Sequence, residues 1–600
     1  MKTRMKLSLP VLCLVLAMSG PSFADIDFSN FHTPNQVNAI LDDLAAVHPG
    51  LARVSTIGTS HEGRPIKVLK ISDNVATDEP DEGDVLFVAL HHAREWISVE
   101  AALYLAEQIL TQYSTNPQLQ ADVNNLEIWI IPVVNPDGFA YTLSDYRFWR
   151  KNRRNNGDGT FGVDLNRNWG YQWGLSSGSS GLTSDATYRG PSAFSEPEIS
   201  ALKTFVEGLD NLKTMLTYHS FSELFLRPWG YTTADAPGEE TLRQLAQRSI
   251  NLIQAVHGHT YGETIGYTSS GETTDWFWGE HRISAFTPEL RPASGGLSAF
   301  APPPSEILPC NEENLPAALA LIHDAGAQEL WMKDYPGDTG AEPSAVWTGT
   351  GWNHAFWVSP DIWTDPATLD QGATVDLKVH IRNDTGQTRS NVRLDVYYTD
   401  PRISLEFPNP DATLIVSRTG LTVPSGGKTE SISWTVPVGT NSWGERHWCV
   451  GAVVMHQSDL PLTTEARRSS NVAIRNFQTT ETVVGTNLLV AATNFLDVDA
   501  ELIVHVDEPP GGWQVILPPA SRPVKGKRLS SIERKGMLLE AKGRLLHPGE
   551  TVYLPVRVVP PLTAHSGDKV DVTVHGGLLP LVAGKRTAVG NGFTYRVVHP

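Results

Sequence analysis

The sequence predicts an α/β domain followed by two all-β domains. Between Asp25 and about Tyr335, short apolar runs alternate with stretches of helical periodicity, which is the pattern of an α/β domain. These apolar runs are continuous rather than alternating, which favours a mainly parallel sheet buried on both faces. From about Asn353 onward, polar and apolar residues alternate in short runs separated by turn residues, as in β-sandwiches.

Each element of the α/β part follows from its own pattern. The apolar run 84–90 (DVLFVAL) predicts a strand, and 98–113, with apolar residues at helical spacing, predicts the helix after it. Residues 125–134 predict a second buried strand that ends in the turn NPDG. A further helix is expected at 195–208 and a further strand at 212–219. We therefore expect a mixed, mainly parallel sheet covered by helices.

The domain boundaries are placed where the pattern changes. A chain of 600 residues is too long for one hydrophobic core. Residues 334–354 are rich in Gly, Pro and Thr, which indicates a linker. Clear strands beyond it are TVDLKVHIRND, ESISWTVPV, LLVAATNF, AELIVHV, ETVYLPVRVV and KVDVTVHGG. The predicted division is an export signal at 1–24, an α/β domain at 25–334, a linker at 335–352, a β-sandwich at 353–477 and a second all-β domain at 478–600.

The first 24 residues have the features of an export signal. Lys2, Arg4 and Lys6 precede the apolar run LPVLCLVLAM, and small residues precede a cleavage site after Ala24. The run is shorter than the roughly 20 apolar residues that a membrane-spanning helix needs. We therefore predict a secreted protein, periplasmic or extracellular, without a transmembrane segment.

Charge and cysteine content narrow the choice of partners. Removal of the signal takes away three cations and no acids, so the net charge of −19 becomes still more negative. An acidic chain is a poor partner for nucleic acid and anionic membranes. The remaining cysteines, Cys310 and Cys449, lie far apart in the sequence, so a disulfide between them is open but cannot be the framework of the fold.

One short stretch, LHHAREWISVE (90–100), contains a candidate metal site. His92 and Glu95 lie at a strand-to-helix turn with a spacing that lets both reach one ion, and zinc accepts both ligand types. The spacing alone is weak evidence, because a chain of this length contains roughly one such pair by chance. His219 follows another buried strand, at the sheet edge where α/β folds build their sites. Two histidines and one carboxylate leave the fourth zinc position open, as in catalytic sites.

A series of further motifs accompanies this site between about residues 25 and 330. In order, they are EGRPI (62–66), HAREW (92–96), NPDGF (135–139), RFWRKNRR (147–154), GVDLNRNW (162–169), YRGPSAFSEPE (188–198), YHSFSE (218–223), GYTSSGETTDW (266–276) and FTPELR (286–291). With them the chain resembles secreted zinc carboxypeptidases of the carboxypeptidase A and B type, including bacterial members with C-terminal β domains. The resemblance implies a sheet of eight strands, one Zn²⁺ per catalytic domain, and hydrolysis of C-terminal peptide bonds. Structural Ca²⁺ is left open.

The resemblance also implies roles for single residues. It makes His92, rather than His91, the metal ligand, and it assigns His91 to the strand, in a packing or supporting role. Glu289 aligns with the general base that takes a proton from the zinc-activated water. Arg150 aligns with the arginine that polarises the scissile carbonyl and stabilises the oxyanion. Asp164 aligns with the carboxylate that orients the ligand His92.

Recognition of a free C-terminus is implied for a second group of residues. Asn166, Arg167 and the mobile Tyr267 align with the residues that bind the terminal carboxylate, and a guanidinium can grip a carboxylate through two parallel hydrogen bonds. Further implied substrate contacts are Arg94, Arg147, Ser220, Glu272 and Thr274. Because Thr274 is small and polar and Glu272 is acidic, we expect mixed specificity for apolar and also Lys or Arg C-terminal residues.

Other readings of the same residues stay open. The stretch RFWRKNRRNN could be a solvated basic loop, which is the expectation for Lys151, Arg153 and Arg154. The chain could be a binding or adhesion protein that keeps the fold without activity, or a peptidase of cell-wall peptides. The β domains could bind a surface, a glycan or a protein, serve as spacers, or aid secretion.

Overall fold

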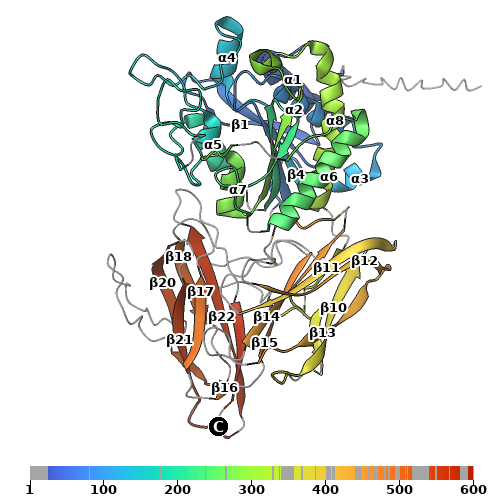
Figure 1. Cartoon of the computed structure of the whole chain (residues 1–600), viewed down its shortest axis with the longest axis vertical. Helices are drawn as coiled ribbons and strands as arrows, with labels where there is room; N and C mark the ends of the chain where they lie inside the picture. Colours follow the sequence, from blue (N-terminus) through green and yellow to red (C-terminus); the bar gives the residue numbers. More distant parts are fainter. Residues whose placement is uncertain are drawn as a thin grey trace, which may run out of the picture.

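In the computed structural model, an α/β part is followed by two groups of β-sheets (Figure 1). The structure describes residues 25–598 with gaps, of which the longer are 339–356, 401–406, 439–446, 464–470, 494–499, 517–538 and 581–591. The expected export signal at 1–24 and most of the expected linker at 335–352 lie outside the described residues.

Eight α-helices, three 3-10 helices and seven strands are described in the α/β part. The helices are α1 (Pro34–Val47), α2 (Ile97–Gln112), α3 (Pro117–Val123), α4 (Pro136–Ser144), η1 (Leu165–Arg167), α5 (Pro197–Val206), α6 (Glu239–His257), α7 (Thr273–His281), η2 (Gly296–Phe300), η3 (Pro304–Glu306) and α8 (Ile307–Gly326). The strands are β1 (Ala52–Thr59), β2 (Pro65–Ile71), β3 (Gly83–Ala89), β4 (Leu126–Ile131), β5 (Leu212–Ser220), β6 (Leu224–Leu226) and β7 (Ser284–Leu290).

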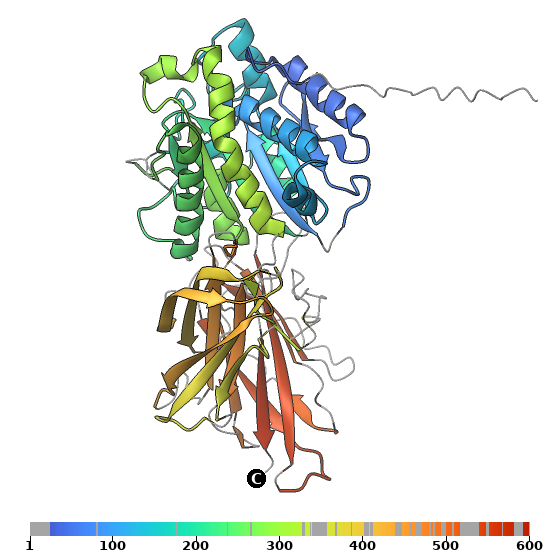
Figure 2. The same ribbon diagram turned by 90° about the vertical axis from the view of Figure 1, so that its right-hand side faces the viewer.

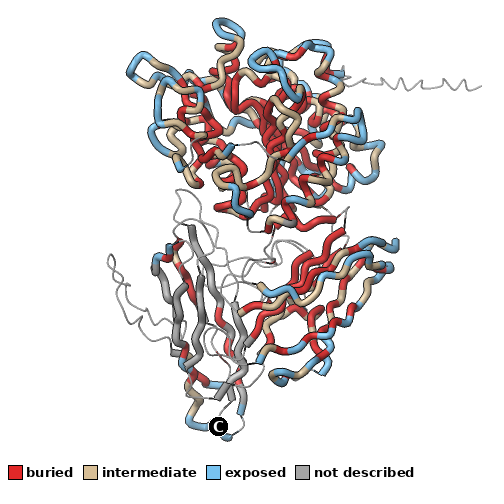
Figure 3. The backbone as a smooth tube through the Cα atoms, viewed as in Figure 1, coloured by how far each residue is buried: buried red, intermediate tan, exposed pale blue. Residues whose placement is uncertain are grey.

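These strands form one sheet in the order β1-β2-β4-β3-β5-β7-β6. The central strands β4, β3, β5 and β7 are parallel, and the outer strands pair in antiparallel fashion. This confirms the expected mixed, mainly parallel sheet, although seven strands are described where the resemblance implied eight. Every residue of β3 and β5 is buried because helices cover both faces of the sheet (Figures 1 and 3).

One expected turn is the start of a helix. The NPDG stretch begins α4: the Asn135 side chain accepts a hydrogen bond from the Gly138 amide at 2.9 Å, and Pro136 takes a first-turn position where no amide is needed. The Asn135 side chain also donates to the carbonyl oxygens of His91 at 3.0 Å and Lys151 at 3.2 Å. This asparagine therefore ties together the two loops that precede α2 and follow α4.

The C-terminal part contains two groups of sheets. In the first group, β13, β10 and β8 form one sheet with β9 paired to β10, while β12, β11, β14 and β15 form another. The second group has a five-stranded sheet, β16-β23-β22-β18-β20, and a three-stranded sheet, β17-β21-β19. The bounds are β8 (Leu330–Trp331), β9 (Ile362–Asp365), β10 (Thr374–Asn383), β11 (Arg389–Thr399), β12 (Thr413–Val423), β13 (Lys428–Thr435), β14 (His447–Met455), β15 (Val472–Gln478), β16 (Thr482–Val483), β17 (Asn487–Thr493), β18 (Ala500–Val506), β19 (Gln514–Ile516), β20 (Leu539–Leu546), β21 (Thr551–Val559), β22 (Lys569–Pro580) and β23 (Gly592–Val598).

The first β group begins earlier in the chain than the sequence predicted. Strand β8 precedes the expected linker, yet Leu330 and Trp331 pair with Asn383 and Arg382 of β10. The two sheets of this group share one apolar core, which is the arrangement of a β-sandwich. The expected all-β architecture of the C-terminal region is therefore confirmed, and the exact domain boundaries stay predictions.

The first β group packs against the edge of the α/β sheet where β7 begins. Ser284, the first residue of β7, donates its hydroxyl to the carbonyl of Leu462 at 2.6 Å. Leu460, Leu462 and Val453 also join the apolar core of the α/β part. Both views show the β groups on one side of the α/β part (Figures 1 and 2). This contact therefore does not cover the opposite edge of the sheet, where β7 ends.

Cys310 and Cys449 are both buried free thiols, so the disulfide that the sequence left open is not formed.

Among the residues that the structure describes, no helix combines the length and the apolar character needed to cross a bilayer.

Gly138 offers a test of how tightly the loops near α4 are packed. A Cβ at this position would lie 2.6 Å from Asn135 Oδ1, 2.6 Å from the Lys151 carbonyl and 2.7 Å from Ala93 Cβ. Overpacking of this kind costs about 1–3 kcal/mol. We expect Gly138→Ala to lower the free energy of unfolding, measured by urea denaturation, by that amount. Gly50→Ala is the control, because no atom lies within 4 Å of its added Cβ; equal stability of the two variants would contradict the packing.

Candidate active site

Three side chains converge at the C-terminal edge of the parallel strands. Strand β3 pairs with β5 so that Ala89 lies opposite Tyr218, which brings His92 and Glu95, just after β3, next to His219. His92 Nδ1 lies 2.9 Å from Glu95 Oε1. His219 Nδ1 lies 3.0 Å from His92 Nδ1 and 3.0 Å from Glu95 Oε2. All three side chains are buried.

The donor set of this cluster fits a zinc ion. Each residue directs one lone-pair atom to a common point, and zinc takes imidazole nitrogen and carboxylate oxygen at about 2.0–2.2 Å. Burial lowers the pKa of His219 to about 4, which keeps the imidazole in its neutral, metal-binding form. Three protein ligands leave a coordination position for water or substrate, as in catalytic rather than structural sites.

His91 does not direct an atom into the cluster. It lies just beyond the end of β3 at Ala89, not within the strand as expected, and its ring stacks on that of His219 with centroids 5.4 Å apart. Its nitrogens face the hydroxyls of Thr217 at 3.2 Å and Thr273 at 3.4 Å. Burial, followed by the nearby histidines, lowers the pKa of His91 well below its usual range. It is therefore a neutral packing partner of the cluster.

Asp164 is the carboxylate that connects the cluster to its surroundings. Its Oδ1 lies 3.0 Å from His92 Nε2 and accepts the amide of Asn166, while Oδ2 accepts two hydrogen bonds from Arg150 at 2.9 and 3.0 Å. Burial alone would raise the pKa of Asp164, but Arg150 and then His92 lower it well below its usual range. An ionised Asp164 favours the proton on His92 Nε2, which leaves Nδ1 with its lone pair toward the cluster.

Arg150 and Glu289 flank the cluster on different elements. Arg150 Nη1 lies 3.7 Å from Glu95 Oε1. Glu289 lies on β7 directly opposite His219 in the parallel β5–β7 register. Burial raises the pKa of Glu289 well above its usual range, and the negative charge of Glu95 adds to this shift. A half-buried carboxylate and a guanidinium therefore stand beside the candidate metal position.

Asn166 and Arg167 are held by backbone contacts in the 3-10 helix η1. Asn166 Oδ1 accepts hydrogen bonds from the amide and the hydroxyl of Thr273 at 2.9 and 2.8 Å, so its amide nitrogen is left as a donor. Arg167 donates from Nε to the carbonyl of Gly178 at 2.8 Å. Tyr267 is 61% exposed, and its hydroxyl interacts electrostatically with Arg167. The Tyr267 hydroxyl also interacts electrostatically with Arg150.

The predicted contacts Arg94, Arg147 and Ser220 lie in the wall of the site. The Arg94 guanidinium packs on the Phe300 ring, 3.8 Å from its centroid. Arg147 donates to the carbonyls of Arg94 at 2.9 Å and Phe300 at 2.8 Å, and it stacks on Trp96, so its guanidinium supports the wall rather than facing the cluster. The Ser220 amide donates to Glu95 Oε2 at 3.2 Å.

Glu272 has two partners near the site that the sequence did not indicate. The resemblance implied that Glu272 and Thr274 line the pocket for the substrate side chain, and Thr274 is indeed buried at the start of α7. Glu272 Oε1, however, accepts a hydrogen bond from Arg167 Nη1 at 3.0 Å and another from the Ser269 hydroxyl. The Glu272 carboxylate therefore pairs with Arg167, the residue expected to bind the substrate carboxylate.

Three supporting residues were not assigned from the sequence. They are Asn135, Ser269 and Thr273, and each binds a site residue or its loop. All three lie inside the motifs NPDGF and GYTSSGETTDW. The motifs could have drawn attention to them. The partners of Asn135 and Thr273 come from distant parts of the chain, whereas Ser269 and its partner Glu272 are three residues apart.

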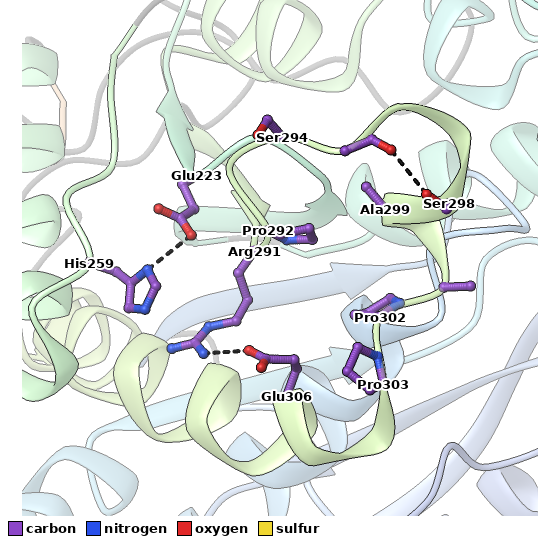
Figure 4. Close-up of a pocket in the computed structure, with 12 residues that line it drawn as sticks. Glu223, His259, Arg291, Pro292, Ser294, Ser298, Ala299, Pro302, Pro303 and Glu306 are labelled. Carbon is purple, nitrogen blue, oxygen red and sulfur yellow. Dashed lines mark hydrogen bonds and ion pairs between the residues drawn. The ribbon is translucent and has the colours of Figure 1, made fainter.

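A separate cavity lies beside the end of β7 (Figure 4). It has a volume of about 360 Å³, and its lining includes Glu223, His259, Arg291 and Glu306. These charges are paired, Glu223 with His259 at 2.9 Å and Arg291 with Glu306 at 2.7 Å. None of the cluster residues lines this cavity.

In the part of the chain that the structure describes, two other groups of His or carboxylate side chains lie close enough together to hold a metal ion. His61 lies near Glu196 and Glu198, but Glu196 already accepts hydrogen bonds from His61, Arg154 and other donors. The second group is acidic and consists of Asp73, Glu79 and Glu82. The sequence left structural Ca²⁺ open and predicted it at neither place.

The two adjacent histidines can be separated by metal content. We expect His219→Ala to lose bound zinc, because it removes one of three ligand atoms, and His91→Ala to retain one zinc per chain. Both variants would be dialysed against a weak chelator and analysed by atomic absorption. Zinc loss in His91→Ala with retention in His219→Ala would refute the assignment, and far-UV circular dichroism would check that both variants are folded.

Comparison with known proteins places the chain in a family. Residues 37–317 match the family model of zinc carboxypeptidases. Zinc carboxypeptidase A 1 of Anopheles gambiae is 35% identical over 308 residues, which cover 50% of this chain and 69% of that protein. Carboxypeptidase B of Astacus astacus is 37% identical over 298 residues, which cover 48% of this chain and 94% of that protein.

Among solved structures, carboxypeptidase A from Helicoverpa armigera is similar to the same part of the chain. Its sequence identity is 30% and its TM-score 0.46, and the match covers 50% of this chain and 75% of that one. The sequence matches above carry the assignment. The chain therefore belongs to the zinc carboxypeptidase family and is a metallocarboxypeptidase of the A/B type.

Proposed function

We propose that the chain is a secreted enzyme that removes the C-terminal residue of peptides and proteins, with His92, Glu95 and His219 as the zinc ligands. The observation that carries this proposal is the convergence of these three side chains beside Glu289, each with a nitrogen or carboxylate oxygen about 3 Å from the other two side chains. A site that had lost its activity would be expected to lack at least one of these groups. The binding-protein alternative is therefore less well supported.

The zinc ion and the side chains of the protein would supply different parts of the hydrolytic chemistry. When bound, zinc supplies Lewis-acid chemistry, which activates water and polarises a carbonyl. Glu289 is placed to accept the proton of the attacking water and to deliver it to the leaving amine. Burial raises the pKa of Glu289, which favours transfer of that proton to its carboxylate. Arg150, held by Asp164, stabilises the developing oxyanion.

Substrate recognition rests on the free C-terminus. Asn166, with its amide nitrogen left as a donor, and Arg167 can bind the terminal carboxylate, and the exposed Tyr267 side chain can cover it. Arg94 would contact the peptide further from the C-terminus. Arg147 is proposed to support Arg94 and Phe300, in view of its two hydrogen bonds to their carbonyl groups.

The β groups are proposed to act away from the chemistry. The contact of Leu462 with Ser284 lies at the start of β7, whereas Glu289 lies near its end. Binding of a surface, glycan or protein by these groups, and export through the segment 1–24, remain parts of the proposal that the comparisons leave open.

The role of Glu289 can be tested by Glu289→Gln. The amide cannot accept the proton of water, so kcat for blocked dipeptides should fall by roughly 10²–10⁴-fold. Bound zinc, measured by atomic absorption, should remain at one per chain because Glu289 is not a proposed ligand. If both the wild type and the variant hold zinc and neither hydrolyses any substrate, the binding-protein reading is correct and the proposed function is wrong.

Substrate preference provides an independent test. We expect the wild-type enzyme to hydrolyse blocked dipeptides ending in Phe or Leu and also those ending in Lys or Arg, because Thr274 is small and Glu272 is acidic. The measurement is kcat/KM for each substrate at pH 7.5. Complete inactivity on the basic pair, with activity on the apolar pair, would rule out mixed specificity.

A further inference from the structure

The ion pair between Glu272 and Arg167 has consequences for substrate choice. Glu272 Oε1 accepts from Arg167 Nη1 at 3.0 Å, and both side chains are largely buried, 14% and 4% exposed. The hydroxyl of Ser269 donates to the same carboxylate. An ion pair with little exposure is weakly screened by water and salt, so it persists under ordinary conditions.

The backbone leaves space for this carboxylate at Gly230. A Cβ added to Gly230 would lie 2.1 Å from Glu272 Oε2. Only the absence of a side chain at this position therefore allows Glu272 to adopt the observed conformation. The contact is with the end of a side chain, so an alanine here would move Glu272 rather than the backbone.

Arg167 is only partly occupied by its other partners. Its described hydrogen bonds run from Nε to the Gly178 carbonyl and from Nη1 to the Asn166 carbonyl and Glu272. A terminal carboxylate that binds Arg167 would then share one guanidinium with a second carboxylate, that of Glu272. Two carboxylates around one cation repel each other, because their charges lie within a few ångströms in a partly desolvated site.

We propose that Glu272 is an internal competitor for the carboxylate-binding arginine, and that this competition selects substrates whose C-terminal side chain is a cation. A C-terminal Lys or Arg residue brings a positively charged side chain that can pair with Glu272. Its terminal carboxylate can then bind Arg167. An apolar residue brings only the carboxylate and leaves Glu272 without a new partner. This inference rests on the proposed function, since it requires Arg167 to bind the terminal carboxylate.

The proposal predicts opposite effects of one substitution on two substrate classes. Glu272→Gln should raise kcat/KM for blocked dipeptides ending in Phe or Leu and lower it for those ending in Lys or Arg. A charge-assisted hydrogen bond corresponds to roughly a tenfold change in each direction, expressed mainly in KM because binding rather than the chemical step is affected. A mere loss of structure would lower all four values together.

Gly230→Ala provides a second variant that keeps the charge of Glu272. Its Cβ should displace the carboxylate from Arg167 and shift the apolar-to-basic ratio of kcat/KM in the same direction as Glu272→Gln. The matched control is Glu306→Gln, which removes another arginine-paired glutamate, at 2.7 Å from Arg291, outside the site. Its ratio should stay within twofold of the wild-type ratio.

The outcomes separate this inference from the proposed function. A wild type with zinc but no carboxypeptidase activity would refute the proposed function. An active wild type whose Glu272→Gln variant gains no activity on apolar substrates would refute the competition alone. If Glu272→Gln does not fold, Gly230→Ala decides: a rise in the apolar-to-basic ratio supports the proposal, and an unchanged or lower ratio overturns it.

Discussion

The parallel pairing of β3, β5 and β7 is the constraint on which the site depends. Parallel strands bring their carboxyl ends to one edge of a sheet, so residues far apart in the sequence meet there. The register sets His219 opposite Glu289 and brings the loop after Ala89 beside Tyr218. A shift of one residue would turn each of these side chains to the other face. Full burial of β3 and β5 by helices makes such a shift costly.

A buried network of charges then gives this edge its chemistry. Asp164 joins His92 and Arg150 through hydrogen bonds of 2.9–3.0 Å, and Arg150 approaches Glu95. Burial strengthens each interaction and also makes an unpaired member expensive, so the groups must be satisfied together. The lowered pKa of Asp164 and the raised pKa of Glu289 are two results of the same low-dielectric site, set apart by their different neighbours.

The same electrostatic reasoning connects catalysis with specificity. Arg150 has a carboxylate partner, Asp164, that holds it toward the cluster, whereas Arg167 has a partner, Glu272, in the place where substrate would bind. In the function that we propose, the first pair preorganises the site and the second sets a condition on the substrate. The β groups pack at the start of β7, so this polar edge is built entirely within the α/β part.

The sequence by itself determined the α/β class and the elements β3, α2, β4, α5 and β5, because apolar periodicity is a local property of the chain. The family and the set of candidate residues came from the resemblance that the motifs carry. Helix α7 and strand β7 were not predicted. NPDG was read as a turn because turn and helix-start signals share the same residues, and the early entry of β8 into the sandwich was not visible from composition. Only the tertiary structure decided that Arg147 supports the wall of the site through the Arg94 carbonyl and that Glu272 pairs with Arg167. Those contacts join residues more than fifty positions apart, and hydrogen-bond partners across such distances follow from packing rather than from any local pattern.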